Sequence, residues 1–477
     1  MGYYAASAGM AIAYPIIPKV LAAVSVKFLL LTDLVLQFFL SWICARSQNA
    51  DILIVCSFAI GFLKGFLMLW FIRYAQKIFS PNNVRSEFYS YFYPLVYGGG
   101  QVSMLVTAQL AYYYDWKYMY YFMMLLMLVA ILLVIICFRH NRPIKSVPIA
   151  DLHIREMFII SAGLLMLMYV INYGKVLDWM SSAKICAYIV IAPMLIALFI
   201  WIQIHSDKPY VSLAPLYQPK AIIGYLYMMI VMFFSTSTTL LTNYLSVILK
   251  VDTTHTYSLY IYLLPGYLAG AFICFWWFRW QRWRFRFLIA GGMGCFVIFF
   301  AILYFGISPG STYEMLYLPI FFRGLGMLTL IIAFALFAVE DLNPKYLLSN
   351  AFFLIIFRSV LTPIMATSFY SNVLYRLGQK YMCSLSETIT TADPLAASKY
   401  SQSLNMALSQ GHKYDEAVQI ATNSLHATLQ QQSLLLALKE ILGYLLVISV
   451  IIAVVSRFIP FHKTIRVTFL RTGDDMV

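Results

Sequence analysis

Thirteen stretches of this sequence are each long and apolar enough to cross a lipid bilayer as a helix. The hydrocarbon core of a bilayer is about 30 Å thick, so a spanning helix needs roughly 20 mostly apolar residues. A helix also satisfies its backbone polar groups within one segment, whereas the alternating pattern of a transmembrane β-strand is absent here. The sequence therefore predicts an all-α polytopic membrane protein with about 13 spans, at residues 3–21, 28–45, 52–72, 88–112, 118–138, 157–173, 184–204, 221–249, 257–278, 287–307, 315–339, 347–371 and 433–456.

Composition excludes the other broad classes of protein. Of the 477 residues, 62% are hydrophobic and 11% are charged, against about 45–50% and about 25% in soluble domains. A water-soluble globule and a disordered chain are therefore excluded. A net charge of +14 would suggest nucleic acid for a soluble protein, but the basic residues lie mostly in short loops between apolar stretches. The seven histidines lie outside the spans without metal-ligand or catalytic spacing, so we expect neither an enzyme nor a metal site.

The distribution of Lys and Arg predicts the orientation of the chain in the membrane. We take as cytoplasmic the loop that carries Arg279, Arg282, Arg284 and Arg286. The cytoplasmic side then holds 20 basic residues and the opposite side holds nine. This orientation places the carboxyl terminus in the cytoplasm. Thirteen spans would place the amino terminus outside, and we expect instead that a first span is missing from this chain.

Several segments are similar, in order and spacing, to motifs of one transporter family. They are an outer loop at 174–182, the entry to a span at 209–217, an aromatic turn at 115–122, Phe357-Arg358-Ser359, a long outer loop at 372–432 and Lys439-Glu440-Ile441. Together they resemble the fourteen-span drug:proton antiporters of the major facilitator superfamily, the EmrB/QacA group. On this alignment residue 3 falls in the second span of the family, so the first span is lacking.

The resemblance implies a major facilitator fold with two six-helix bundles and two extra central helices. The implied domains are an amino-terminal bundle at 1–150, the extra helix pair at 151–207, and a carboxyl-terminal bundle at 208–477 that includes the outer loop 372–432. The implied function is secondary active transport by alternating access, with proton-coupled efflux of amphipathic drugs or other small hydrophobic compounds. A non-transporting membrane scaffold or sensor derived from a transporter is the alternative.

The same resemblance implies a location and partners. The protein would lie in the bacterial inner membrane and use the proton gradient, with no cofactor. Its expected partners are the lipid bilayer, a small amphipathic substrate, and a periplasmic adaptor protein that would dock on the outer loop; nucleic acid is not expected. The chain also departs from the family pattern, because Ser57 replaces an Arg and Met104 stands where a Pro is usual.

Basic residues inside the predicted spans are the first functional candidates, because each costs at least about 2.5–3.5 kcal/mol to insert. Lys64 lies mid-span, nearly two turns after Ser57. We hypothesise that Lys64 supplies the buried positive charge that Ser57 lacks; the alternative is a lysine that snorkels to the interface. Arg358 has two interpretations. It either provides a counter-charge, for an anionic substrate or for a buried carboxylate, or it is a structural tether that bonds to backbone carbonyls. Arg323 lies nearer the outer third of its span, beside two glycines.

Two acidic residues, Glu440 and Asp33, also lie inside spans. Glu440 is either a proton carrier, because burial favours the neutral form of a carboxyl group, or a member of a structural ion pair. Lys439, its neighbour, points about 100° away and is an imperfect partner. Asp33 is about one turn inside its span, and we expect it at the membrane interface.

Polar and small residues complete the set of candidates. A hydroxyl-rich stretch at 235–243 is either the lining of a water-filled cavity or a set of hydroxyls that bond to carbonyls one turn earlier. A tyrosine that follows this stretch is a candidate for stacking on a flat substrate. The pathway candidates here are Thr239, Asn243 and Tyr244. The residues expected to let helices pack closely are Gly61, Gly65, Gly99, Gly100 and Ser103.

Overall fold

The computed structural model describes residues 1–80, 84–138, 152–280, 285–388 and 393–459, and builds them from helices without a strand. The predicted all-α fold is confirmed. The amino-terminal helices are α1 (Gly2–Ala13), α2 (Ile17–Ala23), α3 (Val26–Arg46), α4 (Ala50–Phe79), α5 (Arg85–Tyr113) and α6 (Lys117–Cys137). The next helices are α7 (Ile154–Tyr173), the 3₁₀ turn η2 (Trp179–Ser181) and α8 (Ala183–His205).

The carboxyl-terminal part contains more breaks within its spans. Its elements are η3 (Ala214–Tyr217), α9 (Pro219–Ser235), α10 (Thr238–Asn243), η4 (Tyr244–Ile248), α11 (Thr253–Ser258), η5 (Leu259–Tyr262), α12 (Leu263–Arg279), α13 (Phe285–Gly306), η6 (Tyr313–Leu316), α14 (Tyr317–Phe337), η7 (Pro344–Tyr346), α15 (Leu347–Ile355), η8 (Ile356–Leu361), α16 (Thr362–Thr388), α17 (Pro394–Ser409) and α18 (Tyr414–Phe458). Of these, η4 and η8 are π-helical.

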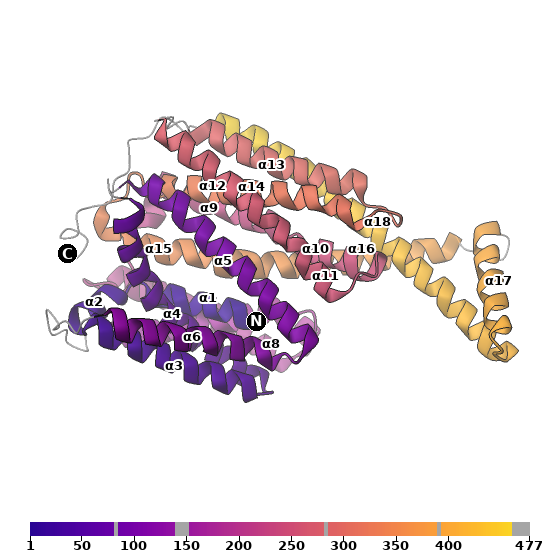
Figure 1. Cartoon of the computed structure of the whole chain (residues 1–477), viewed down its shortest axis with the longest axis horizontal. Coiled ribbons are helices and arrows are strands. Elements are labelled where there is room, and N and C mark those ends of the chain that lie inside the picture. Colours follow the sequence, from indigo (N-terminus) through magenta and orange to yellow (C-terminus); the bar gives the residue numbers. More distant parts are fainter. Residues whose placement is uncertain (81–83, 139–151, 281–284, 389–392, 460–477) are drawn as a thin grey trace.

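The two halves repeat one pattern of helix packing (Figure 1). In the amino-terminal half, α1 packs on α4, and α3 packs on both α4 and α6. In the carboxyl-terminal half, α12 packs on α14, and α13 packs on both α14 and α18. The halves meet where α5 lies against α12 and where α1 lies against η8. The pair α7 and α8 packs together, and α7 contacts both α1 and α16.

Fewer helices of the structure qualify as membrane spans by length and apolarity than the 13 that the sequence predicts. Eleven helices in the described part are long and apolar enough to span a membrane, or twelve if α1 and α2 count as one bent span. The remaining predicted span, 88–112, lies in α5, a helix of 29 residues. This helix is long enough, but its serines, tyrosines and glycines make it less apolar than the others.

Prolines break two of the predicted continuous spans. The stretch 3–21 bends by 62° between α1 and α2, where Pro15 and Pro18 each remove a backbone donor from the helical ladder. The stretch 347–371 changes from α15 to the π-helix η8 and back to α16, and Pro363 is the second residue of α16. The hydroxyl of Thr362 donates to the carbonyl of Phe357 across this break, at 2.6 Å.

The described parts of the predicted outer loop 372–432 are mostly helical. They comprise the end of α16, α17 and the first part of α18, which project together from the bundle (Figure 1). Helix α18 has 45 residues and is therefore about 67 Å long, more than twice the thickness of the bilayer core. The last predicted span, 433–456, is the inner part of this one helix.

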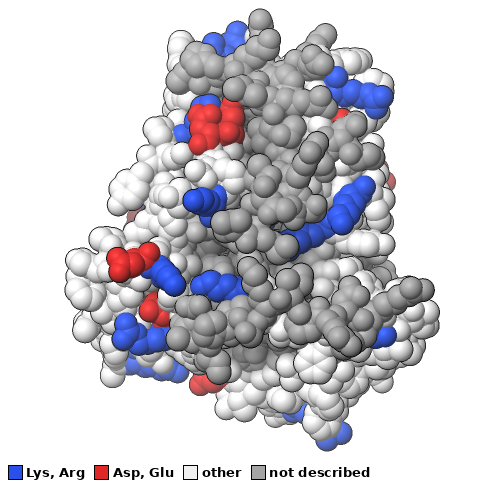
Figure 2. All heavy atoms as spheres, turned by 90° about the vertical axis from the view of Figure 1, so that its left-hand side faces the viewer, with Lys and Arg blue, Asp and Glu red and all other residues white. Residues whose placement is uncertain are grey.

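The opposite end of the bundle carries many Lys and Arg side chains and fewer acidic ones (Figure 2). Lys220 forms ion pairs with Glu340 at 3.2 Å and with Asp341 at 2.7 Å, which neutralise its charge. These ion pairs link α9 to the segment after α14. Arg282 and Arg284, on which the predicted orientation depends, lie outside the described residues, as does the chain from residue 460 onward.

Candidate substrate site

A ladder of tyrosines lies on α5, at the interface between the two halves. Tyr89, Tyr93 and Tyr97 follow one another at four-residue spacing, which places them on one face of the helix. The ring centroids of Tyr89 and Tyr93 are 5.2 Å apart, and those of Tyr93 and Tyr97 are 6.3 Å apart. The ladder continues across the interface, because Tyr97 lies 5.9 Å from Tyr267 of α12.

Arg358 faces this ladder from η8. Its guanidinium is close enough to Tyr93 to interact with that hydroxyl, and its Nε donates to the hydroxyl of Ser359 at 3.3 Å. Tyr97 and Tyr14 are also close enough to interact with its charge. Its Nη1 has no hydrogen-bond partner among the described residues. Arg358, a candidate from the sequence, thus projects from η8 toward tyrosines of α1 and α5. It still has a hydrogen-bond donor available for a ligand.

Arg323 is a second cation inside the spans of the carboxyl-terminal half, where Arg358 is only partly buried. Arg323 lies on α14 and is only 8% exposed. Tyr267 and Tyr260 interact with its charge, while its Nε and Nη1 lack hydrogen-bond partners in the described part of the chain. The glycines beside it serve packing: a Cβ on Gly324 would lie 2.8 Å from the carbonyl oxygen of Leu263.

Neither arginine forms an ion pair with a carboxylate among the described residues. An unpaired buried charge is costly, so such groups in membrane helices mark sites of function. Guanidinium groups bind carboxylates, sulfonates and phosphates through several donors at once. Tyrosine rings offer flat apolar surfaces with a polar edge. The arrangement is therefore suited to an anion that carries an aromatic or otherwise apolar body.

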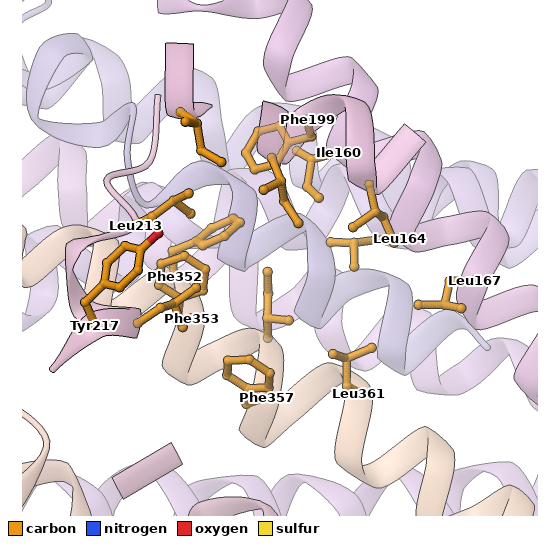
Figure 3. A pocket seen from close by; sticks show the side chains of 15 residues that line it. Ile160, Leu164, Leu167, Phe199, Leu213, Tyr217, Phe352, Phe353, Phe357 and Leu361 are labelled. Atoms are coloured by element: carbon orange, nitrogen blue, oxygen red, sulfur yellow. The ribbon is translucent and has the colours of Figure 1, made fainter. Parts of the chain in front are cut away.

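A hydrophobic cavity of about 380 Å³ lies on the neighbouring face of η8 (Figure 3). Its walls come from α7, α8, η3, α15 and η8, and Tyr217 supplies the one polar side-chain atom among the lining residues. Phe357 lines the cavity, whereas Arg358 faces the tyrosines. Consecutive helical residues point about 100° apart, so one short segment separates an apolar cavity from a cationic site.

The role of Lys64 as a buried positive charge stays a prediction. Its side chain is exposed on α4 and forms no hydrogen bond or ion pair within the described ranges. The close α1–α4 contact is made by neighbouring positions instead, and Ser57 takes part in it: its Oγ lies 3.0 Å from where a Cβ on Gly2 would stand. Ser57 is thus a packing residue in this structure.

Side chains of the hydroxyl-rich stretch bond to backbone carbonyls. The hydroxyl of Thr239 donates to the carbonyl of Thr236 at 3.2 Å, and the amide of Asn243 donates to the carbonyl of Thr239 at 2.8 Å. Tyr244 is fully buried, and its hydroxyl donates to the carbonyl of Ser308 at 2.7 Å. The bond of Thr239 has the pattern of the alternative interpretation of the sequence, whereas Tyr244 joins η4 to the segment after α13.

The two acidic candidates, Glu440 and Asp33, lie in different surroundings. Glu440 accepts hydrogen bonds from Tyr381 at 2.6 Å and Tyr444 at 3.1 Å, and forms no ion pair among the described residues. Tyr381 belongs to α16, ten residues beyond the predicted end of its span, so this hydrogen bond joins α18 to α16. Asp33, expected at the interface, is only 3% exposed. Asp33 is therefore covered by neighbouring side chains, on a helix that packs against α4 and α6, and its depth in the membrane stays a prediction.

The small residues divide into two groups. A Cβ on Gly61 would lie 1.9 Å from the carbonyl oxygen of Ala6, and one on Gly65 would lie 2.8 Å from Cβ of Ala13. Gly99 and Gly100 have open space around them, with no atom within 4 Å of a Cβ. The packing prediction is wrong for this second pair. Ser103, one turn further along α5, is partly exposed.

Sequence reasoning missed the tyrosines that complete the site, Tyr14, Tyr93 and Tyr97. A usable signal was present in the three tyrosines at four-residue spacing on 85–113. Tyrosine is common near the ends of spans, and without the partner helix the spacing does not distinguish a site from an interfacial belt. The partnership with Arg358 joins positions more than 250 residues apart, which no local pattern indicates.

Comparison with known proteins places the chain among transporters. The family model described as Major Facilitator Superfamily matches residues 2–367. A solved structure described as an auto-inhibited POT family peptide transporter aligns over 91% of this chain and 87% of that chain, with 12% sequence identity and a TM-score of 0.42. No curated protein matches the chain significantly.

Proposed function

This chain belongs to the major facilitator superfamily and is a multi-pass membrane transporter rather than an enzyme, and on that premise we propose that it exports negatively charged amphipathic compounds by alternating access. The observation that carries this proposal is the pair of arginines, Arg358 and Arg323, that lie without a carboxylate partner beside the tyrosine ladder. Both belong to the carboxyl-terminal half, while most of the ladder belongs to the amino-terminal half. A rocking motion of the halves would therefore assemble and open the site.

The proposal includes the energy source, the setting and the partners. The proton gradient drives export, without a cofactor, in the bacterial inner membrane, with the carboxyl terminus in the cytoplasm. The bundles at 1–150 and 208–477 move against each other, and the pair at 151–207 lies beside them. The helical projection formed by α16, α17 and α18 is the surface on which a periplasmic adaptor would dock. Figure 2 supports this orientation, because basic side chains gather at the opposite end.

A reconstituted transport assay tests the function directly. Vesicles with an acidic lumen and the purified protein should accumulate the anionic dye 1-anilinonaphthalene-8-sulfonate at least about ten times faster than protein-free vesicles. Ethidium, a cationic aromatic dye, should accumulate much less, because two unpaired arginines repel it. Preferential transport of ethidium would contradict the anionic substrate class. Binding of either dye without accumulation would favour the scaffold alternative.

Replacing Tyr93 by Phe should weaken the site without disturbing the fold. The variant keeps the ring contacts of the ladder and loses the hydroxyl that lies close to the Arg358 guanidinium. Hydrogen bonds to charged groups contribute about 1.5–3 kcal/mol, so we expect kcat/KM for the anionic dye to fall roughly tenfold. Tyr113→Phe, at an exposed position of the same helix, is the matched control. Equal activity of both variants would remove Tyr93 from the site.

A further inference from the structure

Helix α3 carries a buried polar stripe that the transport site does not use. Asp33, Gln37 and Ser41 follow at four-residue spacing on one face and are 3%, 4% and 3% exposed. Helix α3 packs against α4 and α6, so the stripe faces the interior of the amino-terminal half. From Asp33 to Ser41 the stripe rises about 12 Å along the helix, toward the end that we place outside the cell.

The carboxyl group of Asp33 has no adequate partner. Neither of its oxygens has a hydrogen-bond partner of normal geometry among the described residues, and neither has Nε2 of Gln37. Gln37 is still close enough to interact with the carboxyl group. The flanking residues Leu30 and Leu34 are buried in an apolar cluster with Val134 of α6. A polar group in these surroundings is expensive unless it has a task.

The charged and titratable groups on the surrounding helices do not neutralise Asp33. On α3 itself, Lys27 donates to the carbonyl of Ile135 at 3.0 Å. On α4, Lys64 has an exposed side chain, and neither Lys64 nor Arg73 forms an ion pair with Asp33. One turn beyond Ser41, Cys44 of α3 lies close to Cys56 of α4 and Tyr120 of α6.

We propose that Asp33 is a proton-binding site of this transporter, reached from outside along Gln37 and Ser41. The proposal rests on the proposed function, to which it adds the group that couples transport to the proton gradient. An ionised carboxylate without a cation costs several kcal/mol in such surroundings, so the conformation described here holds Asp33 protonated. When the halves rearrange and water reaches the group, its O–H bond breaks, the electron pair stays on the carboxylate oxygen, and the proton passes to water.

The variant Asp33→Asn tests this site, because asparagine has nearly the volume of a protonated carboxyl group and cannot release a proton. Accumulation of 1-anilinonaphthalene-8-sulfonate in vesicles with an acidic lumen should fall at least about tenfold. Exchange of labelled for unlabelled dye without a pH gradient should stay within about twofold of the wild type. Asp33→Glu, which can still bind a proton, should restore part of the gradient-driven transport. Asp207→Asn, in an exposed loop, is the matched control and should change neither process.

A second measurement does not depend on transport. Infrared difference spectra of the purified protein between acid and alkaline buffer should show the C=O band of one protonated carboxyl group that is absent from Asp33→Asn. Identical spectra, or gradient-driven accumulation by Asp33→Asn at the wild-type rate, would overturn the proposal. A wild-type protein that shows the band yet transports neither dye would contradict the proposed function alone and support the proton site.

Discussion

Replacing Arg358 by Gln should lower kcat/KM for the anionic dye by about 10- to 100-fold while the protein remains folded. Arg358 is the cation closest to the tyrosine ladder, and a hydrogen-bonded contact between its guanidinium and an anion is expected to contribute about 1.5–3 kcal/mol. Each 1.4 kcal/mol corresponds to a factor of ten. Arg358→Lys keeps the charge but loses the planar fork of donors, so its activity should lie between the two. The measurement is dye accumulation in vesicles that contain matched amounts of protein.

The matched control is Arg376→Gln, an exposed arginine further along α16. It should transport at the wild-type rate. If Arg358→Gln is as active as Arg376→Gln, Arg358 is a structural tether and the anionic substrate loses its main support. A double variant of Arg358 and Arg323 gives a further check. If both arginines bind the same anion, the two losses should not add, because residues that share a ligand are energetically coupled.

Replacing Gly61 by Ala should strongly destabilise the amino-terminal half. A Cβ at this position would lie 1.9 Å from the carbonyl oxygen of Ala6, and that oxygen belongs to the backbone of α1, so no side chain can move aside. Overpacking of this kind costs about 1–3 kcal/mol or more. The expected result is a lower midpoint of thermal unfolding in detergent and a smaller monodisperse fraction on size-exclusion chromatography.

Gly100→Ala provides the opposite expectation on α5. No atom lies within 4 Å of a Cβ there, and alanine is favoured over glycine in a helix by roughly 1 kcal/mol. Its unfolding midpoint should therefore equal or exceed that of the wild type. Equal midpoints for Gly61→Ala and Gly100→Ala would show that α1 and α4 do not pack as closely as described.

Most of the span boundaries follow from local sequence, because hydrophobic length alone decides whether a segment crosses the bilayer. The predicted stretch 28–45 corresponds to α3, and 118–138 corresponds to α6. The breaks were less predictable. Prolines mark the bend between α1 and α2, but the length of a π-helical segment such as η8 depends on the side chains that satisfy its freed backbone groups.

The sequence did not predict which side of each helix packs against other helices and which side faces lipid. In a soluble protein the apolar stripe of a helix marks the side that packs, whereas lipid and protein interior are equally apolar, so a membrane helix has no such stripe. Asp33 and Lys64 show the consequence: both lie inside predicted spans, yet neighbouring helices cover Asp33 and leave the side chain of Lys64 uncovered.

The sequence by itself determined that this protein is a bundle of membrane-spanning helices with a few charges in the spans, because every segment that crosses a bilayer needs a sufficient apolar length. The tertiary structure decided which of those charges share a site. Arg358 meets Tyr93 only because η8 lies against α1 while α5 lies against α12, and the rotation of each helix about its axis is fixed by close packing at glycines such as Gly61, not by hydropathy.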